Sequence, residues 1–189
     1  MLSVIIPTDG VEQTTVATLA ALVPGAAAGV VREVLLVDRD ASDTIARVAD
    51  VAGCNYLAFE GTRAAALAAG AKQARSPWLM FLNAGAVLDN GWIDETTQFI
   101  QMVSMSDRPR AAVFRYTRSP YTSTGLRDTL KFLARTVAGP SVEQGLLIAR
   151  DHYERLGGHA PESRRAEARL LRQLGRSSRT MLRSRIIVA

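Results

Sequence analysis

The chain opens with Leu2-Ser3-Val4-Ile5-Ile6-Pro7-Thr8-Asp9-Gly10, the stretch from which its fold follows. A short apolar run at 2–6 that ends in turn-forming residues predicts a buried strand, with a turn at 7–10. Over 11–23 the apolar side chains recur at helical spacing instead, and this helix is expected to end near Pro24-Gly25. The sequence thus begins with a strand followed directly by a helix.

The same alternation continues through the first 90 residues. Apolar strands are expected at 34–37, 55–59 and 78–82, with helices at 44–51 and 62–74, the former capped by Ser42 or Asp43. The strands are apolar throughout, which indicates that helices cover both faces of the sheet, as in parallel sheets. The predicted fold class is therefore α/β, with a mostly parallel central sheet and helices on both faces.

Polar loops follow three of these strands, at 7–10, 38–43 and 83–86. In open parallel sheets the ligand crevice lies at the carboxyl ends of the strands. The functional site is therefore expected where these loops gather.

The second half of the chain is less regular. Strands are expected at 111–116 and 145–149, helices at 126–137, 151–156 and 166–174, and a last edge strand at 186–188. We find no internal repeat and no composition shift that would divide the chain, so its 189 residues are predicted to form a single domain.

Composition narrows the class of protein further. A single cysteine, Cys54, excludes an intrachain disulfide framework and a Cys-rich zinc cluster. No apolar run approaches the roughly 20 residues that span a bilayer, and no leader pattern opens the chain, so we expect a cytoplasmic protein. Net charge divides unevenly, −5 over residues 1–100 and +10 over 101–189. The basic half suits phosphate, an acidic acceptor or a membrane surface, or else it is a solvated helical face.

Several motifs, in order and at family spacing, resemble the family 2 glycosyltransferases, which adopt the GT-A (nucleotide-diphospho-sugar transferase) fold. The first-half motifs are 3–8, 34–43, Gly61-Thr62-Arg63, Ala69-Gly70-Ala71 and 78–82. The second-half motifs at 139–145, 150–158 and 171–176 resemble a compact bacterial subgroup, often labelled radical-SAM/selenodomain-associated transferases. The resemblance implies a nucleotide-binding half at 1–90 and an acceptor-side half at 91–189.

The metal motif of the family is altered in this chain. The family ends its fourth strand with carboxylates that hold Mg²⁺ or Mn²⁺ against the sugar diphosphate, since hard divalent ions prefer anionic oxygen ligands. Here that position reads Asn83-Ala84-Gly85, with one neutral side-chain oxygen. Asp89 is the nearest carboxylate and reaches in only if the loop folds back. The resemblance therefore implies a divalent-metal cofactor whose ligands are degenerate here.

The nucleotide loops carry the next candidates. The resemblance implies that Pro7, Thr8, Asp9, Asp38, Arg63, Asn83 and Gly85 bind the nucleotide-sugar donor. Asp38 is the candidate for the base or ribose, and Arg39 either meets a phosphate or forms a surface ion pair with Asp40. Arg63 either bridges phosphate oxygens and replaces part of the metal's charge, or is an ordinary residue near a helix start.

The catalytic base and the acceptor pocket come from the second half. Inverting relatives remove the acceptor proton with a carboxylate at the start of the late helix, and Glu167 holds that position here. The alternative is a solvent-facing glutamate paired at most with Arg164. Glu143, Gln144 and His159 are the implied acceptor residues, although a structural histidine in a turn is the alternative for His159.

Four other residues carry no assigned chemistry. His152 is expected on a helix surface and Cys54 is expected to be buried and inert. Trp78 and Trp92 are expected in the core, although Trp92 beside Gly91 is also a candidate sugar platform.

The leading hypothesis is a glycosyltransferase that moves a sugar from a nucleoside-diphosphate sugar to an unknown hydroxyl acceptor with inversion. The alternative is a catalytically inactive GT-A fold that binds a nucleotide, a glycan or a protein. No nucleic-acid module accompanies the arginines, so no nucleic-acid partner is expected. The Arg-rich second half is a candidate for peripheral contact with the inner face of a membrane.

Overall fold

The computed structural model describes residues 1–106, 108–118, 144–163 and 165–188, which include an eight-stranded mixed sheet. The strands are β1 (Leu2–Thr8), β2 (Val31–Asp38), β3 (Asn55–Ala58), β4 (Trp78–Phe81), β5 (Ala86–Leu88), β6 (Ala111–Arg118), β7 (Leu146–Ala149) and β8 (Arg179–Val188). The helices are α1 (Glu12–Ala27), α2 (Asp43–Ala52), α3 (Arg63–Gln73), α4 (Trp92–Ser104), α6 (Arg150–Arg155) and α7 (Ala166–Gln173). The strand order is β3-β2-β1-β4-β7-β6-β8-β5.

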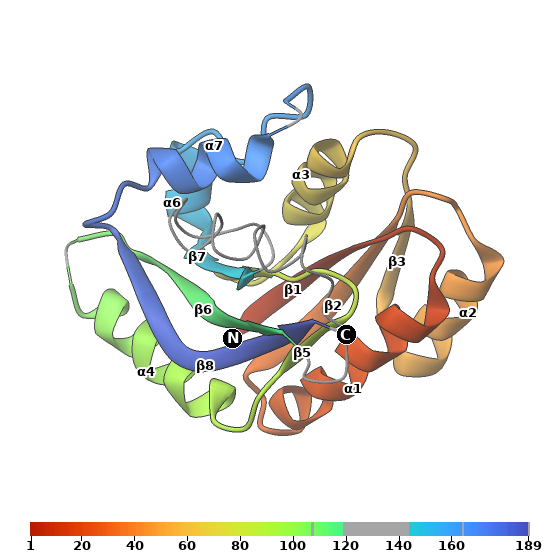
Figure 1. The fold of residues 1–189 in the computed structure, drawn as a ribbon, viewed down its shortest axis with the longest axis horizontal. Coiled ribbons are helices and arrows are strands. Elements are labelled where there is room, and N and C mark those ends of the chain that lie inside the picture. The colour runs from red at the N-terminus through yellow and green to blue at the C-terminus, as the bar shows by residue number, and fades with distance from the viewer. Residues whose placement is uncertain (107, 119–143, 164, 189) are drawn as a thin grey trace, which may run out of the picture.

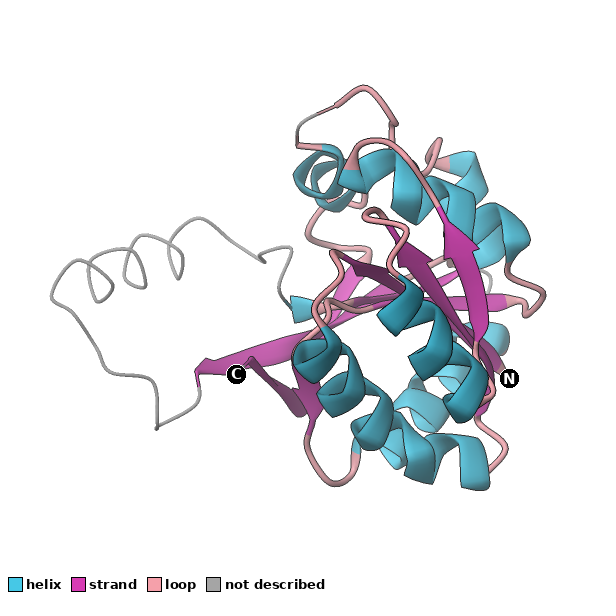
Figure 2. Ribbon diagram, turned by 90° about the vertical axis from the view of Figure 1, so that its right-hand side faces the viewer, coloured by secondary structure: helices cyan, strands magenta, loops and turns pink. Residues whose placement is uncertain are grey.

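Helices cover both faces of this sheet, as the sequence predicts. In Figure 1, α1, α2 and α4 lie against one face and α3, α6 and α7 against the other. Figure 2 shows the strands as a layer between these helices. A hydrophobic core lies on each face of the sheet, and alternate residues of β1 contribute to the two cores. Val4 and Ile6 pack with α1, α2 and α4, whereas Ile5 packs with α3 and α7. Because both faces are buried, every residue of β1 is buried.

The parallel half of the sheet brings the first two loops together. The four strands β3, β2, β1 and β4 are parallel neighbours, and Thr8 at the end of β1 lies opposite Asp38 at the end of β2. Beyond β4 the sheet becomes mixed, because β7 runs antiparallel to both β4 and β6, β8 runs parallel to β6, and β5 runs antiparallel to β8. The carboxyl end of β4 therefore lies at the junction of the two halves.

Helix α1 does not end at Pro24-Gly25, where the sequence suggests a stop. It continues to Ala27, and the backbone N–H of Ala28 donates to the Pro24 carbonyl at 2.9 Å. Proline removes one helical hydrogen bond, but tertiary packing keeps the helix intact here. A Cβ at Gly25 would lie 2.4 Å from the ring of Trp92, so only glycine lets α1 and α4 approach this closely.

The last strand was predicted as a short edge strand at 186–188, and this prediction is wrong. β8 is a ten-residue strand that pairs with β6 on one side and with β5 on the other. Exposed arginines alternate with buried residues such as Leu182 and Ile186, which masks the strand in an apolar-run search. β5 likewise begins within the predicted loop 83–86. The helix predicted at 126–137 lies outside the described residues.

Arg150 ties the two halves together at the start of α6. Its guanidinium donates to the carbonyls of Ala71 at 3.0 Å and Ser76 at 2.9 Å, and also to Ala74, while its own backbone N–H donates to Pro77 at 2.8 Å. Carbonyls at the end of a helix lack helical partners, so this side chain satisfies the C-terminus of α3. The segment between α3 and β4 is thereby fixed to β7 and α6.

Candidate functional site

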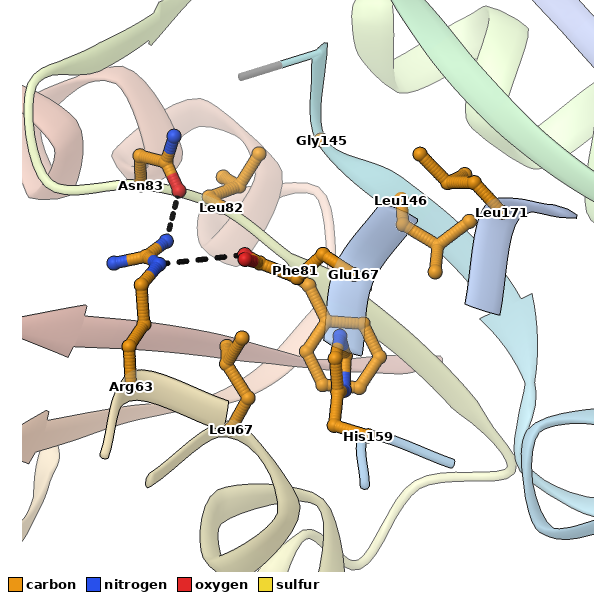
Figure 3. Close-up of a pocket in the computed structure, with 10 residues that line it drawn as sticks. All are labelled: Arg63, Leu67, Phe81, Leu82, Asn83, Gly145, Leu146, His159, Glu167 and Leu171. Atoms are coloured by element: carbon orange, nitrogen blue, oxygen red, sulfur yellow. Dashed lines mark hydrogen bonds and ion pairs between the residues drawn. The ribbon is translucent and has the colours of Figure 1, made fainter. Parts of the chain in front are cut away.

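Four polar side chains from distant parts of the chain line one pocket at the carboxyl end of β4 (Figure 3). They are Arg63, Asn83, His159 and Glu167. The apolar walls of the pocket include the side chains of Leu67, Phe81, Leu82 and Leu171. The cavity measures about 20 Å³, room for about one water molecule.

Arg63 occupies the first position of α3. Thr62 caps this helix by accepting a hydrogen bond from the Ala65 backbone N–H at 3.1 Å, which fixes where the arginine side chain starts. Its Nε lies 3.3 Å from Oε1 of Glu167, and its Nη2 donates to Oδ1 of Asn83. The guanidinium therefore joins the end of β4 to the start of α7.

Glu167 lies in the first turn of α7, as the sequence predicts. Its side chain is 23% exposed and pairs with Arg63. Burial raises the pKa of this carboxyl above its usual value, and the nearby Arg63 cation opposes that shift. Glu167 is thus a partly buried carboxylate in the pocket and not the solvent-facing glutamate that the sequence left as an alternative. Arg164, its other suggested partner, lies outside the described residues.

The loop after β4 does not offer a ligand set for a hard divalent cation. Oδ1 of Asn83 already accepts a hydrogen bond from Arg63, and Gly85 contributes its backbone N–H to Thr14 and Thr18. β5 carries the chain away to Asp89, which pairs with Arg185 at 3.4 Å. Within the described part of the chain, no three Asp, Glu, His or Cys residues gather as a metal site would require.

Asp38 is fully buried and holds the first two loops together. Its Oδ1 accepts from the Thr8 hydroxyl at 2.9 Å and the Gly10 N–H at 3.1 Å, and its Oδ2 accepts from the Ser42 N–H at 2.6 Å. Tyr56 adds a longer hydrogen bond at 3.4 Å. The structure thus brings Pro7 and Thr8 next to Asp38 at the end of β1, apart from the lining of the Arg63 pocket.

Arg39 pairs with Asp9, the neighbour of Thr8, and not with Asp40. Its Nε lies 2.6 Å from Oδ1 of Asp9, and the two side chains are 30% and 50% exposed. This hydrogen bond raises the pKa of Arg39. The contact links the loop after β1 to the loop after β2.

His159 is buried, 3% exposed, and lines the pocket beside Glu167. Its Nδ1 lies 2.9 Å from the Tyr153 hydroxyl, and its ring centroid lies 4.8 Å from that of Phe81. Neither Tyr153 nor Phe81 is predicted from the sequence to be a site residue. The adjacent glycines were the available signal, because a Cβ at Gly158 would come 2.8 Å from the Tyr153 ring. Gln144 precedes the pocket residue Gly145, and Glu143 lies outside the described residues.

The remaining singled-out residues lie away from the pocket lining. His152 was expected on a helix surface, which is wrong: it is buried in the short helix α6, with 7% of its surface exposed. Trp78 and Trp92 are buried in the core, and Trp92 is therefore no exposed sugar platform. Cys54 is half-buried, and burial raises the pKa of its thiol, which keeps it protonated.

Comparison with known families decides the classification. The sequence model of the family described as Glycosyl transferase family 2 matches residues 3–124, more than half of the chain. The chain belongs to glycosyl transferase family 2. Glycosyl transfer is thus the general activity of its relatives. No curated protein matches this family 2 chain significantly in sequence.

Solved structures share the GT-A fold of this family 2 protein. The S. aureus protein TarS (residues 1–349) superposes with a TM-score of 0.71 at 12% identity, covering 100% of this chain and 60% of that chain. The mannosyltransferase PcManGT from Pyrobaculum calidifontis, solved with GDP-Man and Mn²⁺, gives 0.68 at 16% identity, covering 100% and 56%. The chain thus spans less than two thirds of either neighbour. Among its described helices, none combines the length and hydropathy needed to cross a bilayer.

Proposed function

We propose that this protein transfers a sugar from a nucleoside-diphosphate sugar to a hydroxyl acceptor. The observation that carries the proposal is Arg63, held between Asn83 and Glu167 at the carboxyl end of β4 in a family 2 chain. It is supported by the complex of PcManGT, a structural neighbour, with GDP-Man. The proposal assigns donor binding to residues 1–90 and acceptor binding to residues 91–189.

Arg63 is the proposed ligand of the diphosphate. A guanidinium can contact two phosphate oxygens at once, and it stands at the positive N-terminal end of α3, where anions are stabilised. Pro7, Thr8 and Asp9 are the proposed walls of the nucleotide site together with Asp38, whose hydrogen bonds keep the two loops in register. Asn83 and Gly85 complete the donor side. With an amide at position 83, Arg63 supplies the positive charge there.

Glu167 is the proposed base. The acceptor oxygen attacks the anomeric carbon, the bond from that carbon to the diphosphate oxygen breaks with its electron pair leaving on the diphosphate, and Glu167 takes the acceptor's proton. A single displacement of this kind inverts the anomeric configuration. When Arg63 turns to the diphosphate, Glu167 loses the cation that opposes its raised pKa, and it becomes the stronger base.

The residues proposed to bind the acceptor come from the second half of the chain. Gln144 and Glu143 are its proposed hydroxyl-binding residues, with His159 in the pocket itself. The arginines of this half are proposed to give weak contact with anionic lipids, which high salt should abolish. Binding that persists in high salt would contradict an electrostatic cause.

Calorimetric titration with UDP and GDP, each with and without Mn²⁺, tests the donor side. The expected result is binding of one nucleotide with an affinity that Mn²⁺ does not raise, followed by release of sugar from the matching nucleotide sugar. Binding that requires Mn²⁺ would show a cation site beyond Asn83 and Gly85 and remove Arg63 as its substitute. No binding of either nucleotide would refute the proposed donor class.

A second candidate function is a non-catalytic GT-A module that binds a nucleotide, a glycan or a protein. The observation that favours it is the neutral donor set of Asn83 and Gly85, where an anionic one normally offsets the leaving diphosphate. This candidate predicts nucleotide binding with no transfer or hydrolysis of any donor sugar under any metal condition. Measured turnover of a single donor would exclude it.

A further inference from the structure

Tyr153 makes two contacts with His159, and together they determine the position of a proton. The backbone N–H of His159 donates to the Tyr153 hydroxyl oxygen at 3.0 Å, and the same oxygen lies 2.9 Å from Nδ1 of the His159 ring. Both residues are buried, at 6% and 3% exposure. The hydroxyl therefore sits between a fixed donor and a ring nitrogen that can either donate or accept.

A backbone N–H can only donate, so the hydroxyl oxygen is an acceptor in the first contact and keeps its own hydrogen for the second. That hydrogen points to Nδ1, which must then be unprotonated. The opposite arrangement would aim two N–H groups at one oxygen and turn the hydroxyl hydrogen away from the imidazole. The first arrangement satisfies the Tyr153 hydroxyl and Nδ1 of His159, and it leaves the Nε2–H of the ring for another partner.

Both side chains are uncharged at neutral pH, as this arrangement requires. Burial, reinforced by the Arg63 cation, lowers the pKa of His159 to about 4. Burial also raises the pKa of Tyr153 to about 12. A neutral imidazole with an unprotonated Nδ1 carries its proton on Nε2.

The ring is fixed in place as well as in protonation. Phe81 packs edge-on against it at an interplanar angle of 72°, and Gly158 leaves room for the Tyr153 ring beneath the turn. Figure 3 shows the His159 ring rising toward Glu167 from the side of the pocket opposite Asn83. The pocket therefore holds a neutral donor from His159, a cation from Arg63 and a carboxylate from Glu167.

We propose that Tyr153 is a positioning residue that holds His159 as its Nε2–H tautomer, and that this N–H donates to a hydroxyl oxygen that a bound carbohydrate places in the pocket. The inference rests on the proposed function. An anionic oxygen would be drawn to Arg63, whereas an uncharged donor between apolar walls suits an uncharged hydroxyl. The hydroxyl belongs either to the transferred sugar or to a carbohydrate acceptor.

Nuclear magnetic resonance of ¹⁵N-histidine-labelled protein tests the tautomer directly, because the chain has two histidines and His159→Gln assigns their signals. The expected spectrum shows the Nε2–H tautomer for His159 at pH 7 and still at pH 5. Tyr153→Phe should turn this signal into a mixture of tautomers, whereas the matched control Tyr116→Phe should leave it unchanged. An Nδ1–H or doubly protonated His159 in the wild-type protein at pH 7 would overturn the inference without any variant.

The same spectrum tests which carbohydrate carries the hydroxyl that the His159 Nε2–H binds. UDP-glucose and GDP-mannose should shift the Nε2–H signal, while UDP and GDP alone should not, if the hydroxyl lies on the transferred sugar. Methyl glucoside or methyl mannoside added to the UDP or GDP complex should shift it instead if the hydroxyl lies on the acceptor. If a nucleotide sugar binds but the Nε2–H signal shifts neither with it nor with the methyl glycosides, the inference alone is refuted. If no nucleotide or nucleotide sugar binds, the proposed function is refuted as well.

Kinetics of donor turnover give an independent readout. His159→Gln keeps an N–H donor close to the position of Nε2, whereas His159→Asn places its amide near Nδ1. The expected result is a KM for the sugar substrate at least about tenfold higher in His159→Asn than in His159→Gln, with similar kcat. Equal KM values in the two variants, with the fold intact by circular dichroism, would contradict the proposed hydrogen bond.

Discussion

The Nε atom of Arg63 lies 3.3 Å from Oε1 of Glu167, although 104 positions of sequence separate the two residues. Arg63 is the first residue of α3, and Glu167 lies in the first turn of α7. The same guanidinium also contacts Asn83, where the family places its metal-binding carboxylates. The proposed ligand of the leaving group and the proposed base are therefore in contact before any substrate is bound.

Arg63→Met should weaken binding of the preferred nucleoside diphosphate by about 10- to 100-fold, since a charge-assisted pair contributes roughly 1.5–3 kcal/mol. Arg63→Lys should recover only part of this loss, because an ammonium cannot bind two oxygens in a fork. Calorimetric titration measures both. Arg75→Met is the matched control, an exposed arginine beyond the other end of α3, and it should bind like the wild type. Unchanged affinity in Arg63→Met would remove Arg63 from the donor site.

Glu167→Gln should reduce turnover by roughly 100-fold or more, because a positioned general base contributes on the order of 10²–10⁴ in rate. Nucleotide affinity should stay close to that of the wild type, since the amide still accepts a hydrogen bond from Arg63. Donor turnover and calorimetry on one preparation separate the two effects. Glu162→Gln, the same change at an exposed residue, is the control. Wild-type turnover in Glu167→Gln would exclude Glu167 from the mechanism.

Acid should destabilise the protein through His159. Its pKa is about 4 when folded and 6.5 when unfolded, so between these values the unfolded state binds more protons. The stabilisation is fully present above pH 6.5 and is lost as the pH falls, by up to about 3 kcal/mol at pH 4. Urea unfolding from pH 7 to 4.5 should show a shallower decline in His159→Gln than in the wild type. A parallel decline would mean that His159 titrates normally.

Arg150→Lys should lower the free energy of unfolding by about 2–4 kcal/mol. The guanidinium donates to three carbonyls at and after the end of α3, and an ammonium cannot reach all three in one geometry. Urea denaturation measures the change, and Arg155→Lys, an exposed position on the same helix, should be nearly neutral. A midpoint unchanged in Arg150→Lys would show that these carbonyls find other partners.

The first half of the fold could be predicted because its signals are local. β1, β4 and residues 34–37 of β2 are apolar runs, and the turn-forming or polar residues that follow them are adjacent in sequence. Pro24 misled for the opposite reason: the contact that keeps α1 helical there is between Gly25 and Trp92, far apart in the chain. β8 was underestimated because a strand flanked on both sides still exposes alternate arginines.

The sequence singled out the polar residues of this pocket one at a time, but it did not predict how they are arranged. Family resemblance selected Arg63, Asn83 and Glu167 separately, and nothing in their spacing shows that one guanidinium contacts both others. His152 and His159 illustrate the same limit. A short helix or turn has too few residues for a periodic pattern of apolar positions, so the sequence does not indicate whether one polar residue in it is buried. The prediction that His152 lies on the surface was therefore wrong. The role proposed for Tyr153 depends on its hydrogen bond to the ring of His159, six residues later, which the sequence does not show.

The pairing of β5 with β8 sets an order of events in folding. Ala86 lies opposite Val188, so β5 leaves the ribosome about a hundred residues before the strand that will cover it. Until then, the half of the sheet formed by β1, β2, β3 and β4 can assemble, because all four strands lie within the first 81 residues, while β5 offers an unpaired edge. Closing so long a loop is slow, since its entropy is lost before the contacts form. Rapid synthesis at high temperature should therefore favour aggregation through β5, and a chaperone that shields this three-residue edge should raise the yield of folded protein.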